Sequence, residues 1–427
     1  MKYIGAGTRF FYSVVLVNLV RFFFIAVSLF DGKTRRGLRG RRNLFANLKE
    51  KMATVPPGKR IWFHASSLGE FEQAKPIIEI LAEKGFRIIV SFFSPSGFEH
   101  SQGYSHADAI TYIPIDSEKN AREFIRIVNP SVAVMMRYDL WMNHLLSAKR
   151  AGAKIVIADA TFPVKILRQP VPLRRFFQKL YGLTDYILTT NDEHKKLFDA
   201  FLGEEKTVSV GDTRFDRVYE KSLRNDILKK LPLAIDRSGK TVMILGSTWP
   251  EDMDVLHDGL TKISESNPKL LVIVVPHEPS PEEVSRLTGR FPNAKVLSSL
   301  DGHKEDISFL IIDSVGLLTQ LYLIGDIAYV GGGFGAGVHS VLEPAVYGIP
   351  IITGPRIERS DEAVQLMHDG ALTFVSDAEQ AYAAISRAVN NEPERKKAGA
   401  IAKAFVERHI GASAAVASRI EQASSNK

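Results

Sequence analysis

The feature that most constrains the fold is an alternation of short apolar runs with amphipathic stretches, repeated along most of the 427 residues. The runs are rich in β-branched residues, and the stretches between them carry apolar residues at helical spacing. Strands that alternate with helices in this way are typical of parallel, doubly wound sheets. A chain of this length has room for two or three domains. We therefore expect an α/β protein with parallel sheets.

Two sets of runs predict two Rossmann-like domains, over residues 59–215 and 238–410. In the first domain the expected strands are Ile61–Ala65, Arg87–Phe93, Ala109–Ile113, Val132–Met136, Lys154–Ala158, Tyr186–Thr190 and Thr207–Val210. In the second they are Thr241–Gly246, Leu270–Val275, Ala294–Leu297, Ile307–Ile312, Ile327–Val330, Ile349–Thr353 and Ala371–Val375. We expect residues 216–237 to be a linker and residues 411–427 to be a C-terminal tail.

An apolar segment, Phe10–Phe30, precedes the first domain. As a helix its length is about 31 Å, which is close to the thickness of the hydrocarbon core of a bilayer. Arg21 interrupts it, and Asn18 and Ser28 share a helical face with Arg21. The segment therefore either spans the membrane with Arg21 facing a partner or lies in the interface. We expect residues 1–31 to be a retained membrane anchor; a cleaved signal peptide is the alternative, although no small-residue cleavage site follows Phe30.

Basic residues are concentrated just after the apolar segment. Residues 31–60 contain ten Lys and Arg residues against two acidic ones, so the rest of the chain is close to neutral. This basic juxtamembrane segment, residues 32–58, predicts a cytoplasmic position for the two domains that follow it and attraction to anionic head groups. The positive charge of this segment either only sets the orientation of the chain in the membrane or also binds lipid. A nucleic-acid-binding domain typically has positive charge spread over its surface, whereas here it is confined to one segment. We therefore expect no nucleic acid partner. The absence of cysteine excludes disulfides and cysteine nucleophiles.

A glycine-rich stretch follows the strand predicted over Ile327–Val330. Five glycines lie between residues 331 and 337, and a short helix is expected over Leu342–Tyr347. Glycine lets a ligand approach the main chain closely, and a loop at a helix N-terminus is suited to bind phosphate. Glu343, in the first turn, is placed to accept hydrogen bonds from ribose hydroxyls. On its own the pattern fits equally well a crossover whose glycines only make turns.

Polar residues also follow the first strand, in the run HASSLGE that ends at Glu70. Functional groups of parallel sheets collect at the carboxyl ends of strands. By position alone, Glu70 is either a carboxylate favoured by the helix dipole or a catalytic base.

Several of these stretches together resemble one family. The run GGGFGAGVHSVLEPAVYGIPIITGP, residues 331–355, resembles the donor-nucleotide motif of GT-B glycosyltransferases, which have two facing Rossmann-like, doubly wound domains. Within that group the chain most resembles the 3-deoxy-D-manno-octulosonic acid (Kdo) transferases of lipopolysaccharide synthesis. Their HxxSxGE run and helix proline match His64–Glu70 and Pro76, and GSTWP at Gly246–Pro250 is shared. Gly211–Asp216 resembles another run of the family.

The resemblance implies an inverting glycosyltransferase that moves Kdo from CMP-Kdo to the lipid A disaccharide precursor, at the inner membrane. It implies that Glu70 accepts the proton of the attacking hydroxyl. No cofactor and no metal are expected, and the acidic lipid A precursor and the membrane surface are the expected partners. The residues that the resemblance assigns to CMP are Pro276, His277, Gly316, Leu317, Leu318, Ser340, Val341, Leu342 and Glu343.

The chain departs from the family pattern at several positions. Arg137 stands where the family usually has a glutamate, and it either binds a phosphate of the acceptor or forms an ion pair with Asp139 or another neighbour. His277 stands where the family more often has an arginine, Asp212 replaces an asparagine, and Ser340-Val341 replaces Asn-Pro.

Two other functions fit the same pattern. One is a GT-B enzyme that uses a UDP-sugar, as a transferase or an epimerase. The other is a non-catalytic, membrane-tethered protein that binds a nucleotide sugar.

Overall fold

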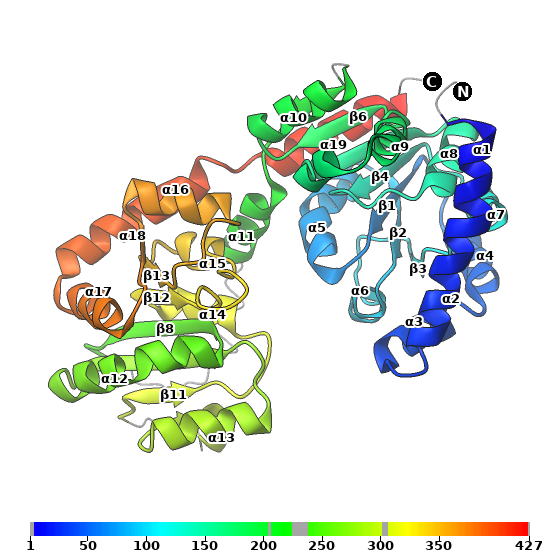
Figure 1. Ribbon diagram of the computed structural model, residues 1–427. Helices are drawn as coiled ribbons and strands as arrows, with labels where there is room; N and C mark the ends of the chain where they lie inside the picture. The colour runs from blue at the N-terminus through cyan, green and yellow to red at the C-terminus, as the bar shows by residue number, and fades with distance from the viewer. Residues whose placement is uncertain (1–3, 204–205, 224–237, 301–305, 426–427) are drawn as a thin grey trace. The chain divides into compact units, whose positions relative to one another are not determined.

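The computed structural model describes residues 4–203, 206–223, 238–300 and 306–425. They fall into two compact units (Figure 1). The first comprises Met1–Arg217 with Ile410–Lys427, and the second comprises Val218–His409. Each unit is an α/β fold around one seven-stranded parallel sheet, as the apolar runs predicted.

The N-terminal sheet has the strand order β3-β2-β1-β4-β5-β6-β7, and every neighbouring pair is parallel. Its strands are β1 (Arg60–Ala65), β2 (Arg87–Phe92), β3 (Ala109–Tyr112), β4 (Val132–Met136), β5 (Lys154–Ala160), β6 (Tyr186–Thr189) and β7 (Thr207–Ser209). The order reverses between β1 and β4, because β2 and β3 lie on one side of β1 and the later strands on the other. Ligands of doubly wound folds bind at such a switch point, beyond the carboxyl ends of the strands.

Helices cover both faces of this sheet. The helices that follow the strands are α5 (Leu68–Glu83), α6 (Pro95–Ser101), α7 (Glu118–Val128), α8 (Met142–Arg150), α9 (Val171–Tyr181), α10 (Asp192–Leu202) and α11 (Thr213–Leu223), with a 3₁₀ turn over Val164–Arg168. Alternate residues of one strand belong to different cores: Trp62 packs with α7, α8 and the earlier helix α4 (Leu44–Thr54), whereas Ile61 and Phe63 pack with α5. Burial on both faces explains why the strands read as continuous apolar runs.

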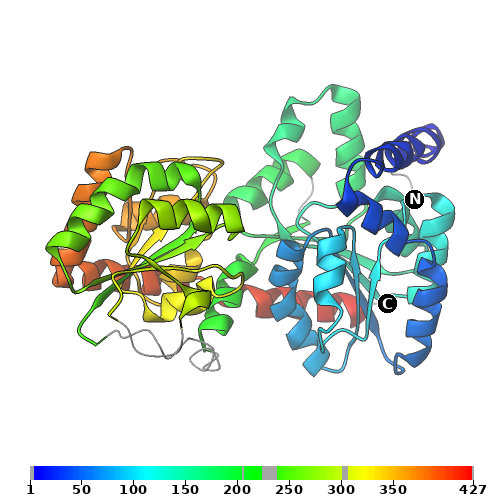
Figure 2. The ribbon, with the colours of Figure 1, turned by 90° about the horizontal axis from the view of Figure 1, so that it is seen from below.

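The C-terminal residues correct one prediction. Residues 411–427 were expected to be a tail, but α19 (Ala412–Ser425) packs against α5 of the N-terminal unit (Figure 2). Val416 and Ile420 are fully buried in that core. Asp216 holds the start of the segment, because its carboxylate accepts hydrogen bonds from the backbone N–H groups of Gly411 (2.5 Å) and Ser413 (2.6 Å). The predicted linker, 216–237, begins inside α11, and its residues 224–237 lie outside the described residues.

The C-terminal sheet has the order β10-β11-β9-β8-β12-β13-β14. Its strands are β8 (Thr241–Thr248), β9 (Leu270–Pro276), β10 (Lys295–Val296), β11 (Phe309–Ile311), β12 (Ile327–Val330), β13 (Ile351–Thr353) and β14 (Leu372–Phe374). Its helices are α12 (Pro250–Ser266), α13 (Pro281–Arg290), α14 (Leu318–Leu321), α15 (Leu342–Ala345), α16 (Asp361–Asp369), α17 (Ala378–Asn390) and α18 (Glu392–Glu407), with 3₁₀ turns over Leu297–Ser299 and Tyr322–Ile324. Here the switch point lies between β8 and β12.

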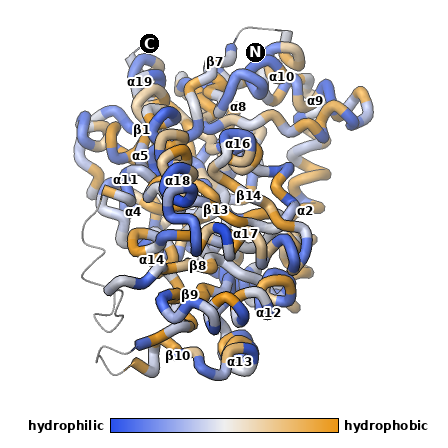
Figure 3. Tube along the Cα trace, turned by 90° about the vertical axis from the view of Figure 1, so that its left-hand side faces the viewer, coloured by the Kyte–Doolittle hydropathy of each residue, from blue (hydrophilic) through white to orange (hydrophobic). Residues whose placement is uncertain are grey.

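The N-terminal apolar segment is a continuous helix made of α1 (Ala6–Phe10), a π-helical turn (Phe11–Leu16) and α2 (Val17–Val27). Among the described residues, Ala6–Val27 is the one helix long and apolar enough to cross a membrane, and Figure 3 shows its hydrophobic character. One face is exposed, including Phe10, Leu19 and Phe22. The basic juxtamembrane segment forms α3 (Gly32–Gly40) and α4 (Leu44–Thr54). Arg35 donates hydrogen bonds to the carbonyls of Ser28 and Leu29 at the end of α2 (2.9 and 2.7 Å).

Candidate active site

Glu70 lies in the first turn of α5, at the switch point of the N-terminal sheet. Ser67 caps the helix and accepts a hydrogen bond from the backbone N–H of Glu70 (3.3 Å). The Glu70 carboxylate turns back and accepts one from the N–H of Ser66 (2.6 Å). Burial raises the pKa of Glu70, and the charge of Asp139 raises it further, against the lowering effects of Ser66, His64 and Arg137. A partly buried carboxyl group whose pKa is raised is a stronger base than an exposed glutamate.

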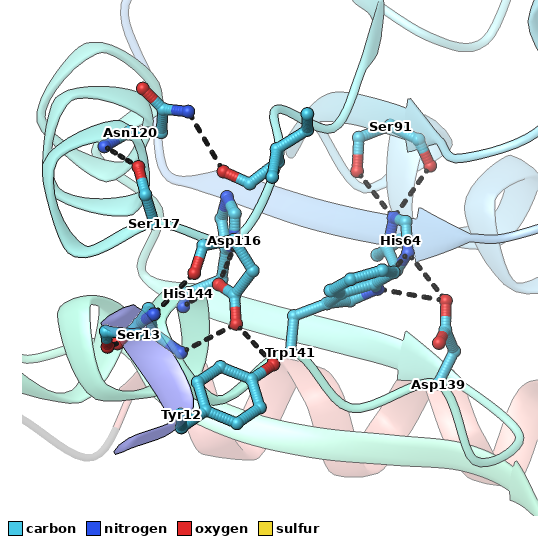
Figure 4. Close-up of polar contacts among 12 residues, drawn as sticks. Tyr12, Ser13, His64, Ser91, Asp116, Ser117, Asn120, Asp139, Trp141 and His144 are labelled. Atoms are coloured by element: carbon cyan, nitrogen blue, oxygen red, sulfur yellow. Dashed lines mark hydrogen bonds and ion pairs between the residues drawn. The ribbon is translucent and has the colours of Figure 1, made fainter. Parts of the chain in front are cut away.

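A polar cluster adjoins Glu70 and joins the ends of β1, β2 and β4 (Figure 4). His64 is fully buried, and its Nε2 atom lies 3.0 Å from Oδ2 of Asp139. Its Nδ1 atom lies 2.9 Å from Oγ of Ser91. The same Asp139 oxygen accepts hydrogen bonds from Trp141 Nε1 (3.0 Å) and from the Ser66 hydroxyl. Asp139 thereby connects the histidine of the HASSLGE run to the loop that carries Glu70.

Arg137, between β4 and this cluster, has a strained backbone. Its φ is +60°, and its N–H donates to the carbonyl of Ala158 (2.8 Å). The Nε atom is buried without a hydrogen-bond partner, and Arg137 forms no ion pair within the part of the chain that the structure describes. The ion pair with Asp139 or another neighbour, one of the two expected roles, is therefore not observed among these residues. A positive φ costs conformational free energy in a residue other than glycine, and such residues cluster at functional sites.

Asp159 ends β5 beside Arg137, also at positive φ (+51°). Its carboxylate accepts hydrogen bonds from the backbone N–H (3.2 Å) and the hydroxyl of Thr213. Burial, reinforced by the charge of Asp212, raises the pKa of Asp159 to about 7. Asp159 directly follows the strand that the sequence predicted over Lys154–Ala158, but its pairing with Thr213 depends on a contact across 54 residues.

In the C-terminal unit, a cavity of about 300 Å³ lies at the switch point between β8 and β12. Its lining residues come from the ends of both strands, from α14 and the turns before and after it, and from α15 and the segment that enters it: Ser247, Gly316, Leu318, Thr319, Tyr322, Val330, His339, Ser340 and Glu343. Ser247, near the end of β8, is like Arg137 and Asp159 a non-glycine residue at positive φ (+52°). The cavity is thus at the position where doubly wound folds bind nucleotides.

Glu343 is the charged residue of this cavity. Its carboxylate accepts a hydrogen bond from the Thr319 hydroxyl (3.1 Å). Burial raises the pKa of Glu343, against the lowering effects of Lys221 and Thr319. A buried carboxylate with one protein donor retains lone pairs that can accept hydrogen bonds from ligand hydroxyls.

Three aromatic rings stack at the edge of the cavity. His277 stacks on both Trp249 (centroids 4.6 Å apart) and His339 (4.5 Å apart), and the centroids of those two rings are 6.3 Å apart. Trp249 Nε1 donates a hydrogen bond to His339 Nε2 (2.8 Å), so this nitrogen carries no proton. Burial lowers the pKa of His339, and the neighbouring His277 lowers it further. The histidine that replaces the family's arginine is therefore part of a ring stack.

Asp252, fully buried in α12, ties the glycine loop to β8. Its carboxylate accepts hydrogen bonds from the N–H of Gly332 (2.9 Å), the N–H of Trp249 (2.8 Å) and the hydroxyl of Tyr329 (2.8 Å). A Cβ atom at Gly331 would lie 2.2 Å from the carbonyl oxygen of Ser247. This glycine therefore serves close packing of the protein's own main chain, rather than the approach of a ligand that the sequence suggested.

The predicted nucleotide-site residues divide into two groups. Gly316, Leu318, Ser340 and Glu343 line the cavity, and His277 stacks on His339, which also lines it. Pro276 ends β9 as a buried residue, and Leu317 precedes α14. The side chains of Val341 and Leu342 are buried, and neither residue lines the cavity. The binding roles of all nine residues stay predictions.

Sequence reasoning did not assign Ser247, Thr319, Tyr322 or His339 to the site. Ser247 belongs to the GSTWP run and His339 to the glycine-rich run, so membership of a run that follows a strand was a usable signal. Nothing in the sequence distinguished Thr319 and Tyr322 from other residues of a helix.

Comparisons with known proteins give the family. A family profile described as 3-deoxy-D-manno-octulosonic-acid transferase (kdotransferase) matches residues 38–217. A 3-deoxy-D-manno-octulosonic acid transferase of Chlamydophila psittaci is 30% identical over 333 residues, which are 75% of this chain and 76% of the relative. The protein of the same name from Haemophilus influenzae is 24% identical and covers 92% of this chain and 93% of its own.

Solved structures give the fold. The UDP-GlcNAc 2-epimerase of Neisseria meningitidis, solved with UDP-GlcNAc, aligns with a TM-score of 0.61 at 13% identity, over 85% of this chain and 99% of that one. A glycosyltransferase of Rickettsia africae aligns with a TM-score of 0.58 at 14% identity, over 87% of this chain and 100% of that one. The fold is therefore GT-B, as expected, and the chain belongs to the Kdo transferase family, the glycosyltransferases that transfer Kdo in lipopolysaccharide synthesis.

Proposed function

We propose that the protein transfers Kdo from CMP-Kdo to the lipid A disaccharide precursor, with inversion at the anomeric carbon. The observation that carries the proposal is the position of Glu70, a carboxylate held by Ser66 at the N-terminal switch point of a Kdo transferase. The oxygen of the acceptor hydroxyl attacks the anomeric carbon, and its proton passes to Glu70. The bond from that carbon to the phosphate oxygen breaks, and CMP leaves with the bonding electron pair.

The neighbours of Glu70 have supporting roles in this reaction. The Ser66 N–H fixes one carboxylate oxygen (2.6 Å), so the other remains for the acceptor hydroxyl. Asp139, held by His64 and Trp141, keeps a negative charge nearby, which raises the pKa of Glu70. A base whose pKa is raised toward the working pH removes a proton more effectively.

The C-terminal cavity is the proposed CMP site. Glu343 would accept hydrogen bonds from the ribose hydroxyls, and backbone N–H groups around Gly316–Leu318 would contact the phosphate. The ring stack of Trp249, His277 and His339 borders the same cavity. Neutral His339 would orient the ligand by hydrogen bonding and would not supply a permanent positive charge.

The proposed location is the inner membrane, with both catalytic domains in the cytoplasm. The exposed apolar face of Ala6–Val27 supports membrane insertion. The basic residues of α3 follow directly after it, and a basic flank stays on the cytoplasmic side of a membrane helix.

The test is to incubate purified protein in detergent with CMP-Kdo and the lipid A precursor, and to weigh the glycolipid product by mass spectrometry. The expected result is a mass increase of one or more Kdo units. Protection against heat unfolding by CMP but not by UMP would support the cytidine-specific site. No product from CMP-Kdo, together with protection by UDP or UMP, would overturn the proposal in favour of a UDP-sugar enzyme.

A further inference from the structure

A second cavity lies in the N-terminal unit, between the membrane helix and the catalytic domain. It measures about 210 Å³ and is bounded by α2, α3, the loop from β2 into α6, and the β4–α8 loop. Most of its lining is apolar: Val20, Phe24, Leu38, Phe93, Pro95, Ile115 and Trp141. Arg21, Lys33 and Arg41 are its charged members. Neither the proposed CMP site nor Glu70 belongs to it.

The membrane helix is held against the domain by buried polar contacts, so it is a fixed wall of this cavity. The Tyr12 hydroxyl donates to Oδ2 of Asp116 (2.8 Å), and the Ser13 hydroxyl donates to Oδ1 of Asn143 (3.1 Å) (Figure 4). Asp116 is 1% exposed and also accepts the backbone N–H groups of Asn143 and His144 (3.0 and 2.9 Å). These contacts fall in the π-helical turn, a feature frequent at functional sites.

Aromatic contacts complete the wall farther along the helix. The Phe24 ring lies 5.4 Å from the Phe93 ring, which stacks on Trp141 at 5.2 Å. Arg41 closes one side, and its guanidinium donates to the carbonyls of Ile113 (3.0 Å), Gly37 (2.9 Å) and Phe93 (2.7 Å). Arg41 is thus engaged by the protein itself and supports the cavity.

Arg21 and Lys33 differ from Arg41. Both are exposed, and neither forms an ion pair within the described ranges of the chain. Arginine inside an apolar membrane segment is costly unless it meets a polar or anionic group. A cavity with an apolar lining and two free cations matches an amphiphile that carries both an alkyl chain and an anionic group.

Two residues of the cavity lining are hydrogen-bonded to the surroundings of Glu70. Trp141, which lines it, donates to Asp139 in the cluster beside Glu70 (3.0 Å). Ser94, which also lines it, donates its N–H to the carbonyl of Ser66 (2.9 Å), and the N–H of Ser66 contacts the Glu70 carboxylate. A molecule seated here would therefore lie next to the residues that handle the acceptor hydroxyl.

We propose that this cavity binds an acyl chain of the acceptor glycolipid, with an acceptor phosphate beside Arg21 and Lys33. The inference rests on the proposed function and adds to it, because the N-terminal helix becomes a wall of the acceptor site as well as an anchor. The occupant is taken to be the acceptor, because the cavity adjoins the Glu70 cluster.

The test reduces the volume of the cavity by enlarging a side chain of α2 that lines it. Val20→Phe places a larger side chain in the lining, and Leu19→Phe is the matched control, because Leu19 is 60% exposed on the outer face and does not line the cavity. Transfer is measured with the acylated precursor and with a fully deacylated, water-soluble acceptor. Val20→Phe should raise KM for the acylated acceptor about tenfold, leaving transfer to the deacylated acceptor unchanged. Leu19→Phe should change neither.

Binding is measured separately from turnover by the tryptophan fluorescence of the protein, to which Trp141 in the cavity lining contributes. An acceptor with brominated acyl chains, in detergent, should quench the wild type and Leu19→Phe and should quench Val20→Phe less. This fluorescence measurement needs no CMP-Kdo, so it reports binding of the acceptor in the cavity independently of Kdo transfer. Equal quenching of the three proteins while the wild type transfers Kdo would overturn the cavity assignment and leave the proposed function intact.

A brominated phospholipid tests the other occupant. The cavity would hold membrane lipid if the phospholipid quenched the fluorescence as strongly as the acceptor does, and if Val20→Phe removed the quenching by both without changing KM for the acylated acceptor. That result would overturn the assignment. Absence of Kdo transfer by the wild type to either acceptor would instead contradict the proposed function.

Discussion

Nε2 of His64 lies 3.0 Å from Oδ2 of Asp139, although 75 residues separate them in the chain. β1 and β4 are adjacent in the sheet, so their carboxyl ends bring the two side chains together. The same Asp139 oxygen accepts hydrogen bonds from Ser66 and Trp141. This contact links the strand that leads to Glu70 with the loop that borders the acyl-chain cavity.

Glu70→Gln should abolish most transfer while leaving the fold intact. The amide keeps the shape of the side chain but cannot accept a proton, and loss of a general base typically costs about 10²–10⁴-fold in rate. Turnover of CMP-Kdo and circular dichroism would be measured together. Glu83→Gln, an exposed position at the end of the same helix, is the control and should be fully active. Near-normal turnover of Glu70→Gln would exclude it as the base.

Asp139→Asn should shift the pH dependence of catalysis. The charge of Asp139 raises the pKa of Glu70, so its removal lowers that pKa. Because the base acts when deprotonated, the acid limb of the kcat/KM profile should move to lower pH. Asp139→Glu retains the charge and should keep the limb near its original position. An unchanged acid limb in Asp139→Asn would show that Asp139 does not influence the base.

Glu343→Ala should weaken CMP binding more than acceptor binding. The variant removes the carboxylate that accepts the Thr319 hydrogen bond in the C-terminal cavity. Loss of a hydrogen bond between a charged group and a ligand costs about 1.5–3 kcal/mol, or roughly 10- to 150-fold in affinity. Calorimetric titration with CMP measures it, with exposed Glu358→Ala as the control. Unchanged affinity would remove Glu343 from the donor site.

Glu72 should contribute stability that depends on pH. Burial raises its pKa, but hydrogen bonds and charges from Lys75 and Arg217 outweigh burial and lower it to about 2. A carboxylate with a depressed pKa stabilises the fold above its ordinary value near 4.5 and loses that contribution as the pH falls toward 2. Glu72→Gln should therefore be less stable in urea at pH 7 by on the order of 1–3 kcal/mol.

The same variant should show a smaller loss of stability between about pH 4.5 and pH 2 than the wild type. Because acid unfolding has several contributors, the comparison is between slopes over that window. Identical slopes would mean that the ion pair with Arg217 does not form in solution.

The sequence alone predicted the sheets well, because the signals that specify these strands are local. Val132–Met136 and Ile327–Val330 were placed at their observed ends, since a strand buried on both faces is read directly as an apolar run bounded by polar residues. Glu70 and Glu343 were selected because chain position at a strand end is also a local property. Boundaries were less accurate where a strand continues into a polar loop, as in β8, which runs on to Thr248.

Long-range contacts decided the rest. The C-terminal segment, expected to be a tail, packs as a helix because Asp216 binds its start and because α5 offers a matching apolar surface. Both partners are far away in the chain, so no local pattern in the segment reveals them. The contacts of Tyr12 with Asp116 and of His64 with Asp139 join positions 104 and 75 residues apart. The sequence by itself therefore determined which segments become strands and which polar residues follow them. Only the tertiary structure decided which of those residues meet, because that depends on strand order and packing distances set by the whole domain.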